Sequence, residues 1–204
     1  MLNEQGWSVT QDSNYEDIIY INNHRGSLEK SEAFIKGYIT FMDKASMLVA
    51  RLVNPQPGER ILDCCAAPGG KSMYMATLMD NVGSLMSCDI HEHKIELMNS
   101  NADRLGASIV HTKVQDATKL PDSWNSYFDR VLVDAPCSGL GILQKKLDMR
   151  WRKQESILRE LPPLQLAILE RAAMTVKEKG YLIYSTCTLN YKENEEVVES
   201  FLQK

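Results

Sequence analysis

Short apolar runs alternate with segments of helical periodicity along most of the chain. Five apolar runs predict buried strands, at Arg60–Asp63, Ser84–Cys88, Ser108–Lys113, Asp129–Asp134 and Tyr181–Ser185. The segments between them space their apolar residues three and four positions apart, as amphipathic helices do. This alternation predicts an α/β fold with a mainly parallel sheet and helices on both of its faces.

Helices are expected on either side of each strand, at Asp43–Val53, Met73–Met79, Ile95–Ala102, Gln154–Lys177 and Asn190–Gln203. Asp43 is a suitable N-cap for the first of them. Pro162 and Pro163 predict a break in the fourth, because proline lacks an N–H donor and clashes with the preceding turn. Gly180 is expected to end that helix.

Residues 1–40 carry weaker signals than the rest of the chain. A short strand is expected at Asp17–Ile21 and a turn at Asn22–Gly26. We therefore predict two parts. Residues 1–40 form an N-terminal appendage or the remnant of a preceding domain, and residues 41–204 form the main domain.

Composition limits the class of protein. With 204 residues, 44% of them hydrophobic and 25% charged, the chain suits one globular domain with a short appendage. No run approaches the ~18 apolar residues of a membrane span, and no signal peptide pattern is present. The cysteines number five, and none lies in a C-x-x-C pair, which argues against a disulfide framework or a metal site and favours a cytoplasmic setting. The net charge of −4 gives no bulk attraction to nucleic acid, so a local basic patch would be needed.

The stretch Ile61–Ser72, ILDCCAAPGGKS, reads as a strand, a loop of small residues and the start of a helix. Such a unit binds nucleotide-like cofactors at the carboxyl end of its strand. It is not a Walker phosphate loop, because Cys65 stands where that motif needs its first glycine, and the G-x-G-x-x-G fingerprint is also absent. A cofactor such as S-adenosylmethionine is therefore indicated.

Two acidic residues follow the next predicted strands. Asp89 lies about 20 positions after the glycine-rich loop, where an acid can bind the hydroxyls of a ribose. It could equally cap the helix that follows. Asp116 lies just beyond the third strand, where it could meet an adenine amino group; alone it would be an ordinary loop aspartate.

Gln144–Lys153, QKKLDMRWRK, is the one strongly basic stretch of the sequence. Its aromatic side chain could stack on a base. The alternative is a solvated helix face. The candidate RNA-binding residues are Lys145, Lys146, Arg150, Trp151 and Arg152.

Two cysteines follow the fourth and fifth predicted strands. Cys137 lies in the second glycine-containing loop and Cys187 in Ser185-Thr-Cys-Thr188. The carboxyl ends of parallel strands meet in one crevice, so both thiols are expected beside the cofactor loop. A thiolate beside a methyl donor suits methylation of an unreactive ring carbon such as cytosine C5, because its addition to C6 makes C5 nucleophilic. Asp134 could support protonation at N3. The alternative is that both cysteines are small packing residues.

The motifs DCCAAPGGKS, Cys88-Asp89-Ile90, Asp116, DAPCSGLG and YSTCTLN, in this order, resemble the RsmB/NSUN family of S-adenosylmethionine-dependent RNA 5-methylcytosine methyltransferases. The resemblance runs from about Gly37 to the C-terminus and implies a Rossmann-like class I methyltransferase fold. Lys145–Lys153 and Leu164–Glu170 are most similar to the bacterial branch that methylates small-subunit ribosomal RNA.

The resemblance also implies roles for individual residues. Cys187 would be the nucleophile, and Cys137 would assist release of the methylated base. In DNA cytosine methyltransferases the Pro-Cys cysteine is the nucleophile, so the chemistry alone leaves the order of the two open. The residues that would bind S-adenosylmethionine are Cys65, Ala66, Ala67, Pro68, Gly69, Gly70, Lys71, Asp89, Asp116 and Asp134.

The sequence departs from the family pattern at both ends. We expect it to lack the N-terminal helical RNA-binding domain and the C-terminal strand pair of the bacterial branch. One alternative function is an RNA-binding or assembly module that holds the cofactor without turnover. Others are a methyltransferase for another RNA, for a small molecule or for a protein. Methylation of a base amino group is disfavoured, because Ala135-Pro-Cys137 stands where such enzymes usually carry a proline-rich aromatic loop.

Overall fold

The computed structural model describes residues 2–3, 6–23, 26–142 and 156–204. Contacts between residues divide the chain into two units. The larger comprises Met42–Ala102 and Ala107–Lys204, and the smaller comprises Met1–Phe41 with Asp103–Gly106. No helix among the described residues is long and apolar enough to cross a bilayer.

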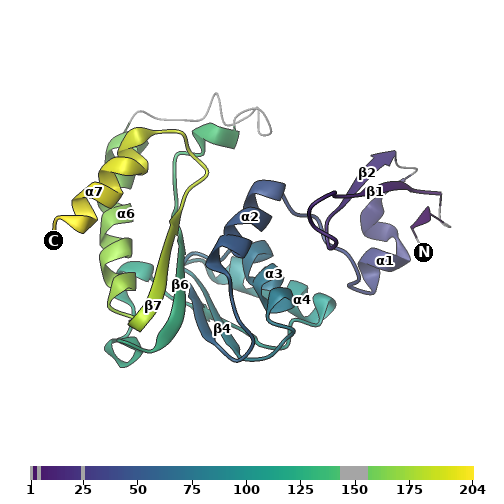
Figure 1. Cartoon of the computed structure of the whole chain (residues 1–204). Coiled ribbons are helices and arrows are strands. Elements are labelled where there is room, and N and C mark those ends of the chain that lie inside the picture. Colours follow the sequence, from purple (N-terminus) through teal and green to yellow (C-terminus); the bar gives the residue numbers. More distant parts are fainter. Residues whose placement is uncertain (1, 4–5, 24–25, 143–155) are drawn as a thin grey trace. The chain divides into compact units, whose positions relative to one another are not determined.

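The larger unit is built on a parallel sheet of five strands in the order β5-β4-β3-β6-β7 (Figure 1). The strands are β3 (Arg60–Asp63), β4 (Ser84–Asp89), β5 (Val110–Val114), β6 (Phe128–Asp134) and β7 (Val176–Ser185). All five strands predicted from the sequence are present. Because β3 lies between β4 and β6, the loops that follow these three strands emerge side by side.

Helices cover both faces of this sheet (Figure 1). One face carries α2 (Lys44–Val53), α3 (Gly70–Leu78) and α4 (Glu92–Leu105), and the other carries α6 (Ile157–Ala173) and α7 (Glu195–Leu202). Short 3₁₀ helices lie between them: η3 (Ala117–Lys119), η4 (Asp122–Trp124), η5 (Leu140–Ile142) and η6 (Tyr191–Glu193). The predicted Rossmann-like architecture is confirmed.

The core explains why the strands are found where they were predicted. Val131, Leu132 and Val133 in β6 are all fully buried, as expected for a central parallel strand covered on both faces. Asp43 accepts a hydrogen bond from Ala45 N at 3.1 Å and begins α2, as predicted from its capping chemistry.

The predicted break near Pro162 and Pro163 is wrong, because α6 runs through both prolines. Their missing N–H groups would have bonded the carbonyls of Leu158 and Arg159 in the first turn of the helix. The first turn is partly exposed, so water can satisfy those carbonyls. Burial of Gln165, Ile168, Leu169 and Ala172 further along holds the helix in place.

The end of α6 also differs from the prediction, which extended the helix to Lys177. The helix ends at Ala173, and β7 begins at Val176, ahead of Gly180. Lys179 adopts a φ of 63° next to Gly180, and the pairing of β6 with β7 shifts its register there. This irregularity is a bulge that lets the strand start early.

The smaller unit contains a hairpin of β1 (Ser8–Gln11) and β2 (Ile19–Asn23), followed by η2 (Leu28–Lys30) and α1 (Glu32–Ile35). The strand expected at Asp17–Ile21 lies two residues further on, and β1 was not predicted. The Arg104 guanidinium stacks on the Phe34 ring, 3.9 Å from its centroid. The domain boundary expected after residue 40 stays a prediction.

Candidate active site

The loop after β3 leads directly into α3 and is lined by small residues. Gly69 adopts a φ of 98°, a conformation that favours glycine. A Cβ on Gly70 would meet nothing within 4 Å, so the start of α3 is open. Within the described chain no side chain caps this helix, which leaves its first N–H groups available to a ligand. Ala66 N donates to Cys88 O at 2.7 Å, so the loop lies against the end of β4.

Asp63 supports this loop from the end of β3. Its Oδ2 accepts a hydrogen bond from Ser72 Oγ at 2.7 Å, and Ser72 Oγ in turn receives one from Ser87 Oγ at 2.9 Å. The three fully buried side chains join β3, α3 and β4. Burial raises the pKa of Asp63 to about 7, although the Ser72 hydrogen bond opposes this shift.

Asp89 lies at the end of β4, beside the loop, and is 8% exposed. Its Oδ1 accepts from His91 N at 2.9 Å and lies 3.5 Å from Lys94 Nζ. These contacts are those of a residue that starts the next helix. Among the described residues, Oδ2 receives no hydrogen bond, so one oxygen remains for a second role.

Asp116 follows β5, the strand next to β4 in the sheet, at the same edge as Asp89. Its neighbour Gln115 donates from its backbone to Asp89 O at 3.0 Å. Asp116 Oδ1 accepts from Thr118 N and Thr118 Oγ1 and caps η3. The Thr118 hydroxyl is the main reason that the pKa of Asp116 is lowered. The carboxylate is therefore ordered and ionised at neutral pH.

Asp134, at the end of β6, is held from two sides. Lys71 Nζ donates to its Oδ2 at 2.6 Å, and Ser185 Oγ donates to its Oδ1 at 2.8 Å. The ion pair connects the predicted cofactor loop with the strand that precedes Cys137. Ser185 is not among the site residues predicted from the sequence. Its position in the YSTCTLN motif, paired with Asp134 in the register of β6 and β7, is the signal that could have found it.

The two cysteines that follow β6 and β7 face one another. Cys137 Sγ and Cys187 Sγ are 3.1 Å apart, and Cys187 N donates to Cys137 Sγ at 3.2 Å. Cys137 is partly buried and Cys187 is exposed. A thiol and a thiolate at this separation share one proton, which sets up the proton transfer that a nucleophilic cysteine requires.

The pKa values of Cys137 and Cys187 are shifted in opposite directions. The hydrogen bond from Cys187 lowers the pKa of Cys137 to about 7, assisted by the backbone N–H groups of Cys187 and Gly139 and opposed by burial. The same hydrogen bond raises the pKa of Cys187, and the nearby Lys71 charge counteracts that rise. One proton thus leaves the pair near neutral pH, whereas the second is strongly retained.

The remaining cysteines have a different setting. Cys64 and Cys88 are buried in the hydrophobic core, and burial raises the pKa of both, that of Cys88 to about 12. Cys65 is partly exposed, and burial of its sulfur raises its pKa as well. Cys64 and Cys88 therefore serve as packing residues of the core.

Comparison with known sequences places this site in a family. Residues 50–204 match the family described as "16S rRNA methyltransferase RsmB/F". The chain belongs to this family. It is 45% identical over 181 residues to "Probable ribosomal RNA small subunit methyltransferase B" of Bacillus subtilis, which covers 88% of the chain and 40% of that protein. The corresponding Klebsiella pneumoniae protein is 32% identical and covers 100% of the chain and 47% of its own length.

Solved structures agree with the RsmB/F assignment. NSun6 from Pyrococcus horikoshii, determined with SFG, has a TM-score of 0.80 and 34% identity, covering 88% of this chain and 46% of that one. A methyltransferase homologue from the same organism has a TM-score of 0.86 and 29% identity, covering 100% and 64%. The chain spans less than half the length of the two curated relatives reported above. It shares the Rossmann-like methyltransferase fold of the solved structures.

The predicted RNA-binding stretch of this RsmB/F-family chain, with Lys145, Lys146, Arg150, Trp151 and Arg152, lies outside the described residues. The contribution of these five side chains stays a prediction.

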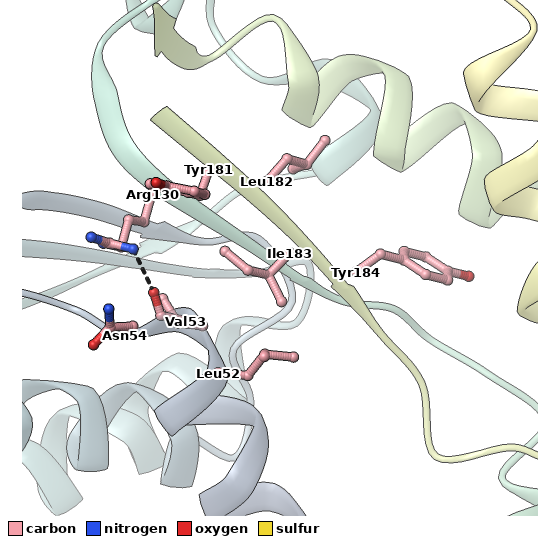
Figure 2. A pocket seen from close by; sticks show the side chains of 8 residues that line it. All are labelled: Leu52, Val53, Asn54, Arg130, Tyr181, Leu182, Ile183 and Tyr184. Carbon is pink, nitrogen blue, oxygen red and sulfur yellow. Dashed lines mark hydrogen bonds between the residues drawn. The ribbon is translucent and has the colours of Figure 1, made fainter. Parts of the chain in front are cut away.

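Among the described residues, two open cavities have linings that include none of the cofactor-loop residues Cys65–Lys71. One, of about 500 Å³, lies between the end of α2 and β7 and is lined by Leu52, Val53, Asn54, Arg130, Tyr181, Leu182, Ile183 and Tyr184 (Figure 2). Arg130 Nη1 donates to Val53 O across it at 2.9 Å. The other, of about 540 Å³, includes Thr186 and Thr188, the neighbours of Cys187. The first cavity contains no residue that sequence analysis selected.

Proposed function

We propose that this RsmB/F-family chain carries the catalytic site of an RNA cytosine-5 methyltransferase that acts on small-subunit ribosomal RNA. The observation that carries the proposal is the 3.1 Å separation of the Cys137 and Cys187 sulfur atoms, beside Asp134 and the loop after β3. Membership of the family and the names of the curated relatives support the RNA substrate.

The residues present suit S-adenosylmethionine. The open, uncapped start of α3 can receive a large cofactor, and its partial positive charge suits a carboxylate. Asp89 would bind the ribose hydroxyls and Asp116 the adenine amino group. The loop Cys65–Lys71 would line the cofactor. When bound, S-adenosylmethionine supplies an electrophilic methyl group.

Cys187 would act as the nucleophile. As Cys187 Sγ forms its bond with C6 of cytosine, its proton passes to the Cys137 thiolate, available near neutral pH, across the short sulfur–sulfur contact. The ring takes up a proton from water at N3, where the Asp134 carboxylate would stabilise it. C5 becomes nucleophilic as a result, because the ring is now an enamine.

The chain's own residues also serve the end of the reaction. After C5 has gained the methyl group, it loses its proton to water, the bond between Cys187 Sγ and C6 breaks, the N3 proton returns to water, and the proton held by Cys137 returns to the departing sulfur. Cys137 is placed to assist this release, because its sulfur lies within hydrogen-bond distance of the departing thiolate. Lys71 fixes Asp134 throughout.

The test is to incubate wild type, Cys137→Ser, Cys187→Ser and the double variant with small-subunit ribosomal RNA and radiolabelled S-adenosylmethionine, then to separate the products on a denaturing gel. We expect wild type to label the RNA at cytosine C5, Cys137→Ser to form a covalent protein–RNA adduct, and both variants that lack Cys187 to form none. RNA labelling by Cys187→Ser at the wild-type rate would contradict the assigned nucleophile. Tight cofactor binding without transfer to any RNA would instead indicate a binding module.

A further inference from the structure

Glu193, in η6, is a fully buried carboxylate that lies between the two cysteine loops. Glutamate is rarely buried in this way unless it is fully hydrogen-bonded. Its Oε2 accepts from Ser138 N at 2.7 Å and from Gln165 Nε2 at 3.1 Å, and its Oε1 accepts from Asn190 Nδ2 at 2.9 Å. These donors are all neutral, so the carboxylate is satisfied by oriented dipoles.

The first two donors fix the backbone on both sides of Cys137. Ser138 follows Cys137 directly. Gln165 Nε2 also donates to Pro136 O, the residue before Cys137, at 2.9 Å. Glu193 and Gln165 therefore hold the backbone of Pro136–Ser138, the segment that carries the Cys137 sulfur.

The same cluster continues into the loop that carries Cys187. Ser138 Oγ lies 2.8 Å from Thr188 Oγ1, and Thr188 directly follows Cys187. Asn190, the third donor to Glu193, donates its backbone N–H to Thr188 Oγ1 at 3.3 Å. The hydrogen bonds around one carboxylate thus reach residues adjacent to both cysteines.

We propose that Glu193 is a positioning residue that holds the Cys137 and Cys187 sulfur atoms at reacting distance. It does so by anchoring the loops after β6 and β7 to a single buried carboxylate. The use of that geometry in catalysis rests on the function proposed above, whereas the anchoring itself does not. A carboxylate suits this role better than an apolar side chain, because it accepts three hydrogen bonds from two separate loops and a helix.

The charge state of Glu193 is consistent with this role. Burial acts to raise its pKa, but the hydrogen bonds from Ser138, Asn190 and Gln165 outweigh burial and hold the pKa below its ordinary value. Glu193 is therefore ionised at neutral pH and accepts from all three donors at once. Loss of the anchor would separate the sulfur atoms, and Cys137 would lose the hydrogen bond that lowers its pKa; this loss outweighs the smaller, opposite effect of removing the Glu193 charge, which raises that pKa.

The experiment measures sulfur proximity directly in the full chain, without RNA. Glu193→Ala and Glu193→Gln are compared with wild type and with Glu196→Ala, which removes an exposed acid three residues away. Diamide oxidises neighbouring thiols to a disulfide, and its azo group takes up the two electrons and two protons. The rate of formation of the Cys137–Cys187 disulfide is followed by peptide mapping. The pH dependence of Cys137 alkylation, thermal unfolding and cofactor affinity are measured alongside.

We expect Glu193→Ala to slow formation of this disulfide at least about tenfold and to move the alkylation midpoint of Cys137 upward from about 7. Glu193→Gln keeps the size of the side chain and one acceptor, so an intermediate rate is expected, and Glu196→Ala should match wild type. A folded Glu193→Ala or Glu193→Gln chain with the wild-type rate and midpoint would overturn the proposal. If Glu193→Ala does not fold, the rate of disulfide formation in Glu193→Gln tests the proposal in its place. Failure of wild type to methylate RNA would count against the proposed function and leave this result standing.

Discussion

Lys71 Nζ lies 2.6 Å from Asp134 Oδ2, and this ion pair joins the loop after β3 to the end of β6. The two side chains are only 18% and 27% exposed. Ser185 Oγ completes the arrangement by donating to the other oxygen of Asp134 at 2.8 Å. Side chains from the first turn of α3 and from the ends of β6 and β7 therefore meet at one carboxylate, next to the cysteine pair.

Replacing Lys71 by Ala should affect both stability and thiol reactivity. Asp134 would lose its charged partner in a mostly buried position, at a cost of about 1–3 kcal/mol in the free energy of unfolding. The pKa of Cys187 would rise further, because the Lys71 charge counteracts that rise. Denaturant unfolding and the alkylation rate of Cys187 measure the two effects. Lys71→Arg is the matched control, since it keeps the charge, and it should retain most of both properties.

The buried carboxyl group of Asp63 predicts a specific pH dependence of stability. Its pKa is about 7 in the folded chain and near 3.8 when unfolded, so between these values the folded state holds a proton that the unfolded state has lost. This group therefore destabilises the fold progressively as the pH rises from about 4 to 7. Asp63→Asn should remove that contribution, because the amide stays neutral and can still accept from Ser72.

The measurement for Asp63 is the difference in unfolding free energy between Asp63→Asn and wild type across this pH range. The difference should move in favour of the variant as the pH rises and become constant above about 8. Asp129→Asn is a suitable comparison: hydrogen bonds that outweigh burial lower the pKa of Asp129, so its stabilising contribution is lost only as the pH falls below about 4 and should be nearly constant over this range. A difference for Asp63→Asn that is independent of pH would show that Asp63 is ionised throughout.

Asp89 allows the cofactor role to be separated from the helix-start role. Asp89→Asn keeps an acceptor for His91 N but removes the negative charge. If Asp89 binds the ribose hydroxyls, Asp89→Ala and Asp89→Asn should both weaken S-adenosylmethionine binding, by about 1–3 kcal/mol for the alanine variant. Titration calorimetry provides the measurement. Lys94→Ala, which leaves the carboxylate intact, should bind normally. Unchanged affinity in both Asp89 variants would remove the ribose assignment.

The strands could be predicted from the sequence because central parallel strands are short, continuous apolar runs, such as Val131–Val133 in β6. The break at Pro162 and Pro163 was expected for a sound reason, yet tertiary burial of α6 outweighed the loss of two hydrogen bonds near its first turn. The early start of β7 depends on a bulge at Lys179 and Gly180, and periodicity does not encode such a bulge.

The site was predictable as a set of loops at one edge of the sheet, but not as a set of contacts. The pairing of Lys71 with Asp134 follows from the adjacency of β3 and β6, which are separated in sequence by two strands and two helices. The role of Glu193 was not predictable, because the residue lies in a charged, helix-like segment where acids usually face solvent. Its burial depends on donors from loops and helices up to 55 residues away in sequence.

The register of β6 and β7 aligns Asp134 with Ser185, so Cys137 and Cys187 stand three and two positions beyond a single paired rung. Fifty residues separate the cysteines in sequence, yet their spacing is set by two adjacent strands, by one buried acid and by Gln165 of the helix between them. The dithiol is therefore a portable module. Grafted with the paired residues Asp134 and Ser185, the anchoring acid and the Gln165 amide of the connecting helix onto neighbouring strands of another parallel sheet, it would be expected to bring two sulfur atoms together.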